Sequence, residues 1–325
     1  MPAGNQFSVL DSRDIIADFY PKLEAANESL WSNSVSITIP STRAVEEFAW
    51  LGQVPAMRKW IGGRTEEPVN KYTMSITNYD YEATLAISVP DLRRDKTGQL
   101  RQRVADLAVR TATHKNKLAG DLITAGEAGT ISLAYDGQYF YDSDHNESGS
   151  NQTNTLGATE VPASNVATTS TLTTAEAADI ITQTIAYMMT YTDDKGEPIN
   201  QAITDVKILV TKQGHFVGIK NALSLANLGT GSGNNNPILA WGGINISVEY
   251  VPTRITAADK LYFFLGTPGM GTAPVIFTEE NGVQTQLIGA GSEEEFKNNR
   301  HLFGVTATRG CGYGMWQRSA VVTLT

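Results

Sequence analysis

Four histidines and one cysteine are the residues of this chain that could most readily support metal binding or nucleophilic catalysis. His114, His145, His215 and His301 are dispersed, and no two of them have the spacing of a metal site. Cys311 lies between two glycines with no histidine near it in sequence, so we expect a small buried residue rather than a nucleophile. A single cysteine also excludes a disulfide framework within the chain and fits a reducing compartment. We therefore predict no catalytic residues, no metal ligands and no cofactor.

Three short segments resemble chemical motifs but lack part of the required pattern. The segment 142–147 begins like a calcium loop, but Glu147 and Thr153 stand where such a loop needs Gly and Glu. We interpret it as a solvated acidic turn. The segment 229–233, Gly-Thr-Gly-Ser-Gly, lacks the Lys-Ser/Thr ending of a phosphate-binding loop. The run of three glutamates at 293–295 is typical of a solvated face or a helix start.

The composition indicates a folded chain that does not wrap nucleic acid. The 325 residues are 41% hydrophobic and 18% charged, which is typical of a globular protein with about two domains. The formal net charge is −9, whereas a protein that binds DNA over its surface is normally basic. If the chain encloses a genome, its acidic surface would leave the DNA mobile. The start lacks the features of a signal peptide and no apolar run approaches the ~20 residues of a membrane span, so we expect a soluble protein with no membrane contact.

Hydrophobic spacing predicts an arm that combines a helix and a strand at the start of the chain. Apolar residues recur at helical spacing from Ile16 to Leu30, with Pro21 expected to kink the helix or divide it in two. A short strand is expected at 34–40. This segment is too small to form a domain of its own.

An extended ribbon and a long helix are expected next. Between Trp50 and Val89, two stretches alternate polar and apolar residues, and a polar link at 62–68 predicts a loop tip. A long ribbon has little core of its own, so it should rest on another surface. Segment 99–126 contains no proline and keeps helical spacing throughout, which predicts a helix on the order of 40 Å long.

The second half of the chain mixes helices with strands. Segment 128–169 is rich in small polar residues and is expected to be a surface excursion. Thr173 and Glu176 have the spacing of a capping box at the start of a second helix. A further helix is predicted at 213–227, and strands are predicted over Val206–Val210, Ile244–Val251, Leu261–Leu265, Val275–Thr278 and His301–Leu324. Helices and strands do not alternate strictly, so the fold class should be α+β.

Several sequence elements in a fixed order resemble the Mu-like major head subunit family of tailed phages. The segment 50–64, Trp-Leu-Gly-Gln-Val-Pro-Ala-Met-Arg-Lys-Trp-Ile-Gly-Gly-Arg, is similar to that family's opening signature. A Tyr-Thr-Met strand at 72–74 and a Val-Pro-Asp entry to the long helix at 89–91 follow in the family's order. The resemblance is densest over 47–145, which includes Asp136, Gly137, Phe140, Asp144 and His145, and it continues more thinly at Asn236, Pro237, Trp316 and Gln317. No family residues occur between 146 and 201.

The resemblance implies an α+β chain with the Hong Kong 97-type capsid fold. The implied parts are an N-terminal arm at 1–47, an extended β-ribbon loop at 48–95, a peripheral domain with a spine helix at 96–160, an axial domain at 161–275 and a return to the peripheral domain at 276–325. The arm, ribbon and long helix found from hydrophobic spacing occur in the same order.

The same resemblance implies a major capsid protein. Its copies would self-assemble into hexamers and pentamers of an icosahedral head that encloses double-stranded DNA without sequence-specific binding. The implied partners are other copies of the chain, a separate scaffolding protein and a portal, with a decoration protein as a further candidate. The implied place is the virion capsid, assembled in the cytoplasm of the bacterial host.

Two alternatives stay open from the residues alone. The same fold could form the shell of a cargo-holding nanocompartment, and a phage-encoded enzyme would need a nucleophile with a base in reach. For a shell, the candidate contacts between subunits are aromatic and charged residues of the ribbon, namely Trp50, Arg58, Trp60, Arg64, Glu66 and Glu67. The competing interpretation makes the tryptophans core or loop anchors and the charges solvated surface pairs.

Overall fold

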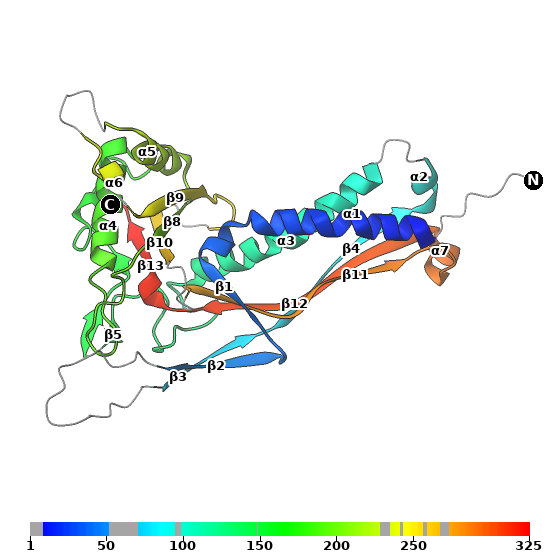
Figure 1. Ribbon diagram of the computed structural model, residues 1–325, viewed down its shortest axis with the longest axis horizontal. Helices are drawn as coiled ribbons and strands as arrows, with labels where there is room; N and C mark the ends of the chain where they lie inside the picture. Colours follow the sequence, from blue (N-terminus) through cyan, green and yellow to red (C-terminus); the bar gives the residue numbers. More distant parts are fainter. Residues whose placement is uncertain are drawn as a thin grey trace, which may run out of the picture.

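The computed structural model describes residues 9–51, 71–94, 99–147, 149–227, 235–240, 243–255, 259–266 and 273–325. These residues form a broad body at one end of the molecule and an elongated half at the other (Figure 1). Helices and strands contribute to both parts.

Two helices run along the elongated half. The long helix α3 (Gln99–Ala125) confirms the predicted helix, and α1 (Val9–Glu28) lies along it (Figure 1). Phe19 and Leu23 of α1 are buried in a small core with α3 and a strand beneath, whose other buried members are Val104, Ala108, Ala112, Phe303 and Val305. The apolar stripe of α1 is therefore buried against its neighbours rather than exposed to water.

α1 remains one continuous helix through Pro21, so the expected division into two short helices does not occur. Proline lacks the N–H that would bond to the carbonyl four residues earlier. Phe19 and Leu23 pack into the same core on either side of Pro21. This shared packing holds the helix together across the missing hydrogen bond.

A four-stranded sheet forms the other layer of the elongated half. Its order is β1 (Ser36–Pro40), β11 (Val275–Ile288), β12 (Arg300–Tyr313) and β4 (Tyr79–Ser88). Only the β1–β11 pair is parallel. Two short helices, α2 (Val89–Arg94) and α7 (Glu293–Asn298), lie at the far end of this half (Figure 1).

The ribbon consists of β2 (Val45–Leu51) and β3 (Lys71–Thr77), which pair antiparallel with Trp50 opposite Tyr72. β4, whose alternation resembles that of β3, pairs with β12 instead of extending the ribbon. In Figure 1 the ribbon leaves the four-stranded sheet and points back toward the broad body.

The broad body is built on a five-stranded sheet. Its order is β7 (Thr155–Leu156), β13 (Ser319–Thr323), β10 (Lys260–Gly266), β8 (Asp205–Val210) and β9 (Asn245–Tyr250). The body also contains α4 (Thr174–Met188), α5 (Gln213–Ser224), α6 (Pro237–Ala240) and the hairpin β5 (His145–Glu147) with β6 (Ser150–Gln152). α4 begins with the predicted capping box between Thr173 and Glu176.

The largest core cluster fills the broad body and reaches the near ends of α3 and β12. It joins α4 to the five-stranded sheet and includes Leu122 and Ile123 of α3 and Tyr313 of β12. Short 3-10 helices at Trp31–Ser34, Pro162–Ser164 and Trp316–Arg318 lie beside this core. Segment 276–325 therefore contributes strands to both sheets, β11 and β12 to one and β13 to the other. None of the described helices combines the length and apolar character needed to cross a membrane.

Candidate functional site

His145 and Trp316 meet at the centre of a buried cluster. The two rings stack with centroids 4.0 Å apart and planes 6° apart. Nδ1 of His145 lies 2.6 Å from Oδ2 of Asp136, and both side chains are shielded from solvent. The carboxylate orients the imidazole, and the stack fixes its plane. We call this group, together with Tyr135, Phe140 and Gln317, the junction.

The junction ties the end of α3 to the strands that enter the broad body. Phe140 stacks on Tyr313 with centroids 4.5 Å apart, and the Tyr313 hydroxyl donates to the carbonyl of Leu122 in α3 at 2.7 Å. The Gln317 amide donates to the Tyr135 hydroxyl at 2.6 Å. Buried hydrogen bonds of this kind specify one arrangement because each unmade partner would carry a desolvation cost.

Two buried asparagines complete the junction, and both were missed by the sequence analysis. The Asn154 amide donates to the carbonyl of Phe140 at 2.7 Å, and the Asn200 amide donates to the carbonyls of Met188 and Gln317, each at 2.8 Å. Both asparagines lie in polar, loop-like stretches, where a buried amide has no local sequence signal. Their role depends on contacts with residues far away in the chain.

Gly137 and Asp144 lie beside the junction and have different roles. Gly137 adopts φ 86° in a turn, which favours glycine. Its N–H donates to the carbonyl of Ala134 at 3.0 Å. Asp144 is exposed, and the hydrogen bond that its protonated carboxyl can donate to Asp142, together with the negative charge of Asp142, raises the pKa of the Asp144 carboxyl. The interpretation of 142–147 as a solvated acidic turn fits the exposed residues Ser143 and Asp144, but it is wrong for the second half, where β5 begins with the fully buried His145.

Asn236 and Pro237 lie away from the junction, in the connection between α5 and α6. The Asn236 amide donates to the carbonyl of Leu225 at 2.8 Å, and its side-chain oxygen accepts from the N–H of Ile238 at 3.0 Å. Pro237 opens α6, where proline is favoured because its missing N–H has no helical partner. These two residues shape a local turn.

The junction does not have the features of an active site. A His–Asp pair at 2.6 Å could orient a general base, but His145 is fully buried, so no substrate could reach it. Among the described residues, no group of three His, Cys, Asp or Glu side chains is placed to hold a metal. Cys311 packs beside the main core, and burial raises the pKa of its thiol, which disfavours the nucleophilic thiolate. The arrangement fits a structural joint.

The base of the ribbon is fixed to the four-stranded sheet by close packing. Met74 and Ile76 of β3 are buried with Ile276 of β11. Ile76 lies directly over Gly312 of β12, where an added Cβ would come 2.6 Å from Ile76 Cγ1. Glycine at this position therefore lets the ribbon approach the sheet, because any larger residue would meet the isoleucine.

A buried amide also anchors the turn that follows the ribbon. The Asn78 side-chain nitrogen donates to the Ser41 hydroxyl and to the Arg43 carbonyl, both at 2.7 Å. Its oxygen accepts from the Thr278 hydroxyl at 2.6 Å. One side chain thus connects the segments before and after the ribbon to β11, so the ribbon leaves the sheet in a defined direction.

A charged cluster lies between α3 and the four-stranded sheet. Glu279 is 3.4 Å from Lys115 Nζ and 3.9 Å from Nη2 of the buried Arg309, which stands opposite it in the β11–β12 register. Burial lowers the pKa of the Arg309 guanidinium. The sequence analysis missed Arg309, although it shares the inward alternation of Phe303 and Val305 in β12 and could have been found from that period.

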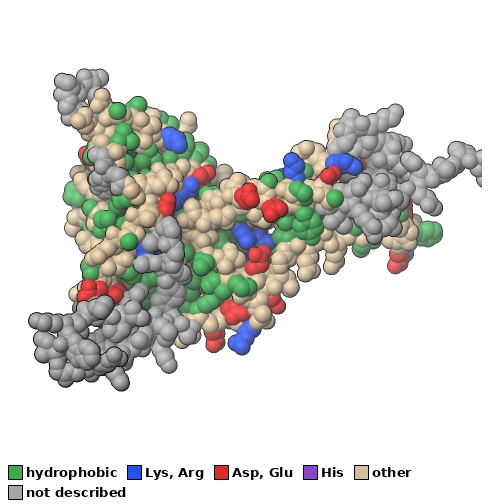
Figure 2. Space-filling model, in the orientation of Figure 1, with side chains coloured by type: hydrophobic (Ala, Val, Ile, Leu, Met, Phe, Trp, Pro, Cys, Tyr) green, Lys and Arg blue, Asp and Glu red, His purple; other side chains and the backbone are tan. Residues whose placement is uncertain are grey.

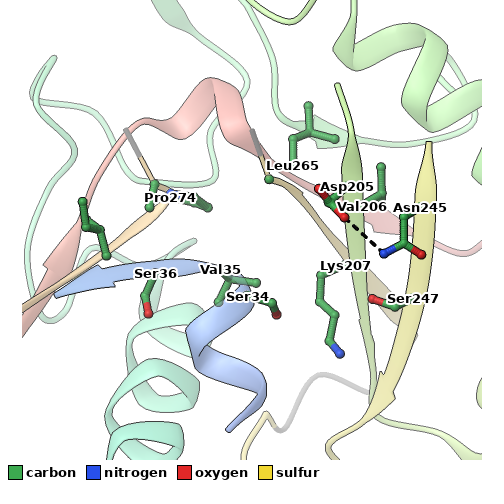
Figure 3. Close-up of a pocket in the computed structure, with 13 residues that line it drawn as sticks. Ser34, Val35, Ser36, Asp205, Val206, Lys207, Asn245, Ser247, Leu265 and Pro274 are labelled. Carbon is green, nitrogen blue, oxygen red and sulfur yellow. Dashed lines mark hydrogen bonds between the residues drawn. The ribbon is translucent and has the colours of Figure 1, made fainter. Parts of the chain in front are cut away.

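A cleft of about 430 Å³ separates the arm from the broad body. Figure 3 shows Ser34, Val35 and Ser36 on one side and Asp205, Lys207 and Asn245 on the other. The Asn245 amide donates to Asp205 at 3.1 Å, and Lys207 pairs with Glu249 at 3.1 Å. Asp205, Asn245 and Lys207 already pair within the body, so these side chains do not form a binding site for a charged ligand in the cleft.

Residues 14–175 match the protein family described as "Mu-like prophage major head subunit gpT". Through this segment, the chain belongs to the Mu-like major head subunit family. The matched part contains the ribbon strands, α3 and the motif residues from Asp136 to His145. Trp316 and Gln317 lie outside it, although the fold brings them into contact with the motif.

Two curated proteins are similar to this chain over part of its length. The Mu-like prophage FluMu major head subunit of Haemophilus influenzae is 31% identical over 130 residues, which are 39% of this chain and 41% of that protein. The major capsid protein of Escherichia phage Mu is 28% identical over 128 residues, which are 39% of this chain and 40% of that protein. The alignments thus span about two fifths of these relatives.

Solved phage capsids have the same fold as this chain. A chain of the procapsid of bacteriophage JBD30 aligns with a TM-score of 0.51 and 18% identity, covering 97% of this chain and 76% of that chain. A chain of the mature capsid of bacteriophage PhiM1 aligns with a TM-score of 0.52 and 15% identity, covering 90% and 86%. These likenesses confirm the predicted α+β fold of the Hong Kong 97 type.

The structure does not describe the side chains of the six candidate contact residues. Arg58, Trp60, Arg64 and the two glutamates at 66–67 lie outside the described residues. Trp50 belongs to β2, but its side chain is not described. Their role between subunits stays a prediction.

Proposed function

We propose that this chain is the major capsid protein of a tailed bacteriophage and that its copies form the shell of the head. The observation that carries the proposal is the family match over 14–175, because it covers the arm, the ribbon and the long helix, which are the extended elements of the fold. The capsid-like fold along nearly the whole chain supports it independently.

The extended parts of the chain have little hydrophobic core of their own. The described base of the ribbon is only two strands wide and contributes two buried side chains, Met74 and Ile76, to a small cluster with the sheet. A two-stranded ribbon is marginal in water. Contact with neighbouring copies would bury the rest of its surface, so that part of the folding free energy becomes assembly free energy.

We infer that the parts of the chain have the roles implied by the sequence. The arm at 1–47, the ribbon at 48–95 and the spine-helix region at 96–160 with its return at 276–325 form the periphery of a capsomer, apart from β7 and β13, which belong to the five-stranded sheet of the broad body. The segment 161–275 surrounds its axis. Such capsomers would be hexamers and pentamers of an icosahedral shell, acting without catalysis, cofactor or membrane.

The charge distribution supports a shell that does not bind the enclosed DNA tightly. The net charge is −9, and on the face in Figure 2 the described Lys and Arg side chains lie in small groups near acidic ones. Binding to DNA phosphates would need an extended basic surface. The shell would therefore enclose double-stranded DNA without sequence-specific contacts. Scaffolding, portal and decoration functions would come from other proteins, with assembly in the host cytoplasm.

Electron microscopy of the purified chain and of one ribbon variant tests the proposal. The wild-type chain should form rings, shells or tubes. Replacing 62–69 by a short flexible linker should leave the circular dichroism spectrum unchanged but prevent closed shells, because loop tips tolerate change locally whereas subunit contacts do not. Normal shells from the variant would show that the ribbon tip is not needed for assembly. A wild-type chain that never assembles would refute the proposed function.

A further inference from the structure

Three large apolar side chains are exposed on the loop that follows α3. Ile131 is 53% exposed, Leu133 44% and Tyr139 45%. We call these three residues the loop patch. Apolar groups that remain in contact with water on one short segment lower stability unless something covers them, and such groupings mark interaction surfaces more often than scattered single residues do.

The loop patch is preorganised by a glycine. Gly129 adopts φ 60°, and a Cβ added there would come 2.6 Å from the ring of Tyr139 and 3.0 Å from Leu133. Both side chains therefore converge on the same glycine. Their close approach requires a residue without a side chain, and it places two apolar groups beside each other at the surface before any partner binds.

The junction holds the loop from beneath. The N–H of Tyr141 donates to the carbonyl of Gly126 at 3.0 Å, which closes the base of the loop. The N–H of Ala134 donates to the carbonyl of Gln138 at 2.9 Å, and Asp136 between them is bound to His145 at 2.6 Å. The buried pair of Asp136 and His145 therefore helps to position the exposed loop patch. The junction thus has a structural role in addition to packing the core.

The segment that carries Ile131 and Leu133 is free of charge, whereas the N–H of Tyr139 donates to the carboxylate of Asp142 at 3.3 Å. Residues 128–135 contain no Asp, Glu, Lys or Arg. The flanking charges are engaged within the chain, since Glu127 pairs with Lys260 and Asp136 with His145. Two copies of a chain with net charge −9 repel each other over acidic surfaces, and that repulsion is weakest where an uncharged apolar surface forms the contact.

From these observations we infer that the loop patch is a contact surface for a second copy of this chain in the assembled shell. The inference rests on the proposed function, which surrounds each subunit with copies. The charge argument favours a copy over a basic partner, because a basic partner would gain nothing from an uncharged surface.

The test compares two double variants of the purified chain, so that any partner is a copy. Ile131→Ser/Leu133→Ser removes the apolar surface, whereas the matched control Ile131→Val/Leu133→Met keeps it. Both should remain folded and unfold within a few degrees of the wild-type temperature, because about half of each side chain is exposed. The serine variant should need roughly tenfold or more protein for half-assembly, measured by light scattering, while the control stays close to wild type.

Hydrogen exchange of the wild-type chain provides the second measurement. Backbone amides of 128–135 should exchange more slowly in assembled particles than in free subunits. Unchanged exchange there, or assembly of the serine variant at the wild-type concentration, would overturn the inference while leaving the proposed function intact. A wild-type chain that never assembles would overturn both.

Discussion

The imidazole of His145 lies flat against the indole of Trp316, with ring centroids 4.0 Å apart, and it joins two segments from opposite halves of the sequence. His145 opens β5 after the loop that follows α3, and Trp316 opens the 3-10 helix between β12 and β13. The contact therefore holds β5 of the broad body against the segment where the chain passes from β12 of the elongated half to β13 of the broad body.

Replacing Trp316 should destabilise the whole chain. Trp316→Ala leaves a cavity beside His145 and Tyr191 and should lower the free energy of unfolding by about 3–5 kcal/mol. Trp316→Phe retains a ring for stacking and should cost distinctly less. Denaturant titration followed by circular dichroism measures both. Equal losses for the two variants would show that a phenyl ring restores no stability at this position, which would contradict a contribution from ring stacking.

Gly312 should tolerate alanine only when Ile76 is shortened. The added methyl of Gly312→Ala would meet Ile76 Cγ1 and Cδ1, so overpacking should cost roughly 1–3 kcal/mol. Ile76→Ala removes both atoms and should reduce the cost of the second change. A double-mutant cycle from unfolding free energies checks this coupling. Strictly additive losses of unfolding free energy would indicate that Ile76 at the base of the ribbon does not pack against Gly312.

The stability of the chain should fall as the pH drops from about 6.5 toward 4, and His114 should account for part of the loss. Burial, reinforced by the charges of Arg309, Lys117 and Arg254, lowers the pKa of His114 to about 4. In the unfolded chain this pKa is near 6.5. The unfolded state therefore takes up the proton first on acidification, so the contribution of His114 is complete above pH 6.5 and is lost as the pH approaches 4.

Substituting His114 isolates that contribution. His114→Gln should reduce the loss of unfolding free energy between pH 6.5 and 4.5 by about 1 kcal/mol, a figure discounted because the side chain is only half-buried. His215→Gln is the matched comparison, because burial also lowers the pKa of His215. If His114→Gln has the same pH dependence as wild type, His114 is not shielded as the structure indicates.

Local patterns predicted most of the elements but not how they pair. The long helix, the capping box at Thr173 and the strand at β8 followed from periodicity and end signals. The partner of β4 did not, because β3 and β4 have the same alternation and only long-range packing assigns β4 to β12. Pro21 was expected to interrupt α1, yet packing on α3 outweighs the lost hydrogen bond.

The site was predictable in its residues but not in its geometry. The resemblance pointed to Asp136, His145 and Trp316, and the fold brings them together. It also pointed to Asn236, which lies elsewhere. Asn154 and Asn200 could not have been found, since a buried amide differs from a surface one only by contacts that arise in the folded chain.

The mass of the purified chain in solution tests the central claim most directly. Static light scattering across a range of concentrations should show a transition from the 35.1 kDa subunit to particles many times that mass. A shell protein requires this transition because its copies cover one another's apolar surfaces. A protein that stays at the subunit mass, with a sharp unfolding transition at the highest concentrations, would contradict the account.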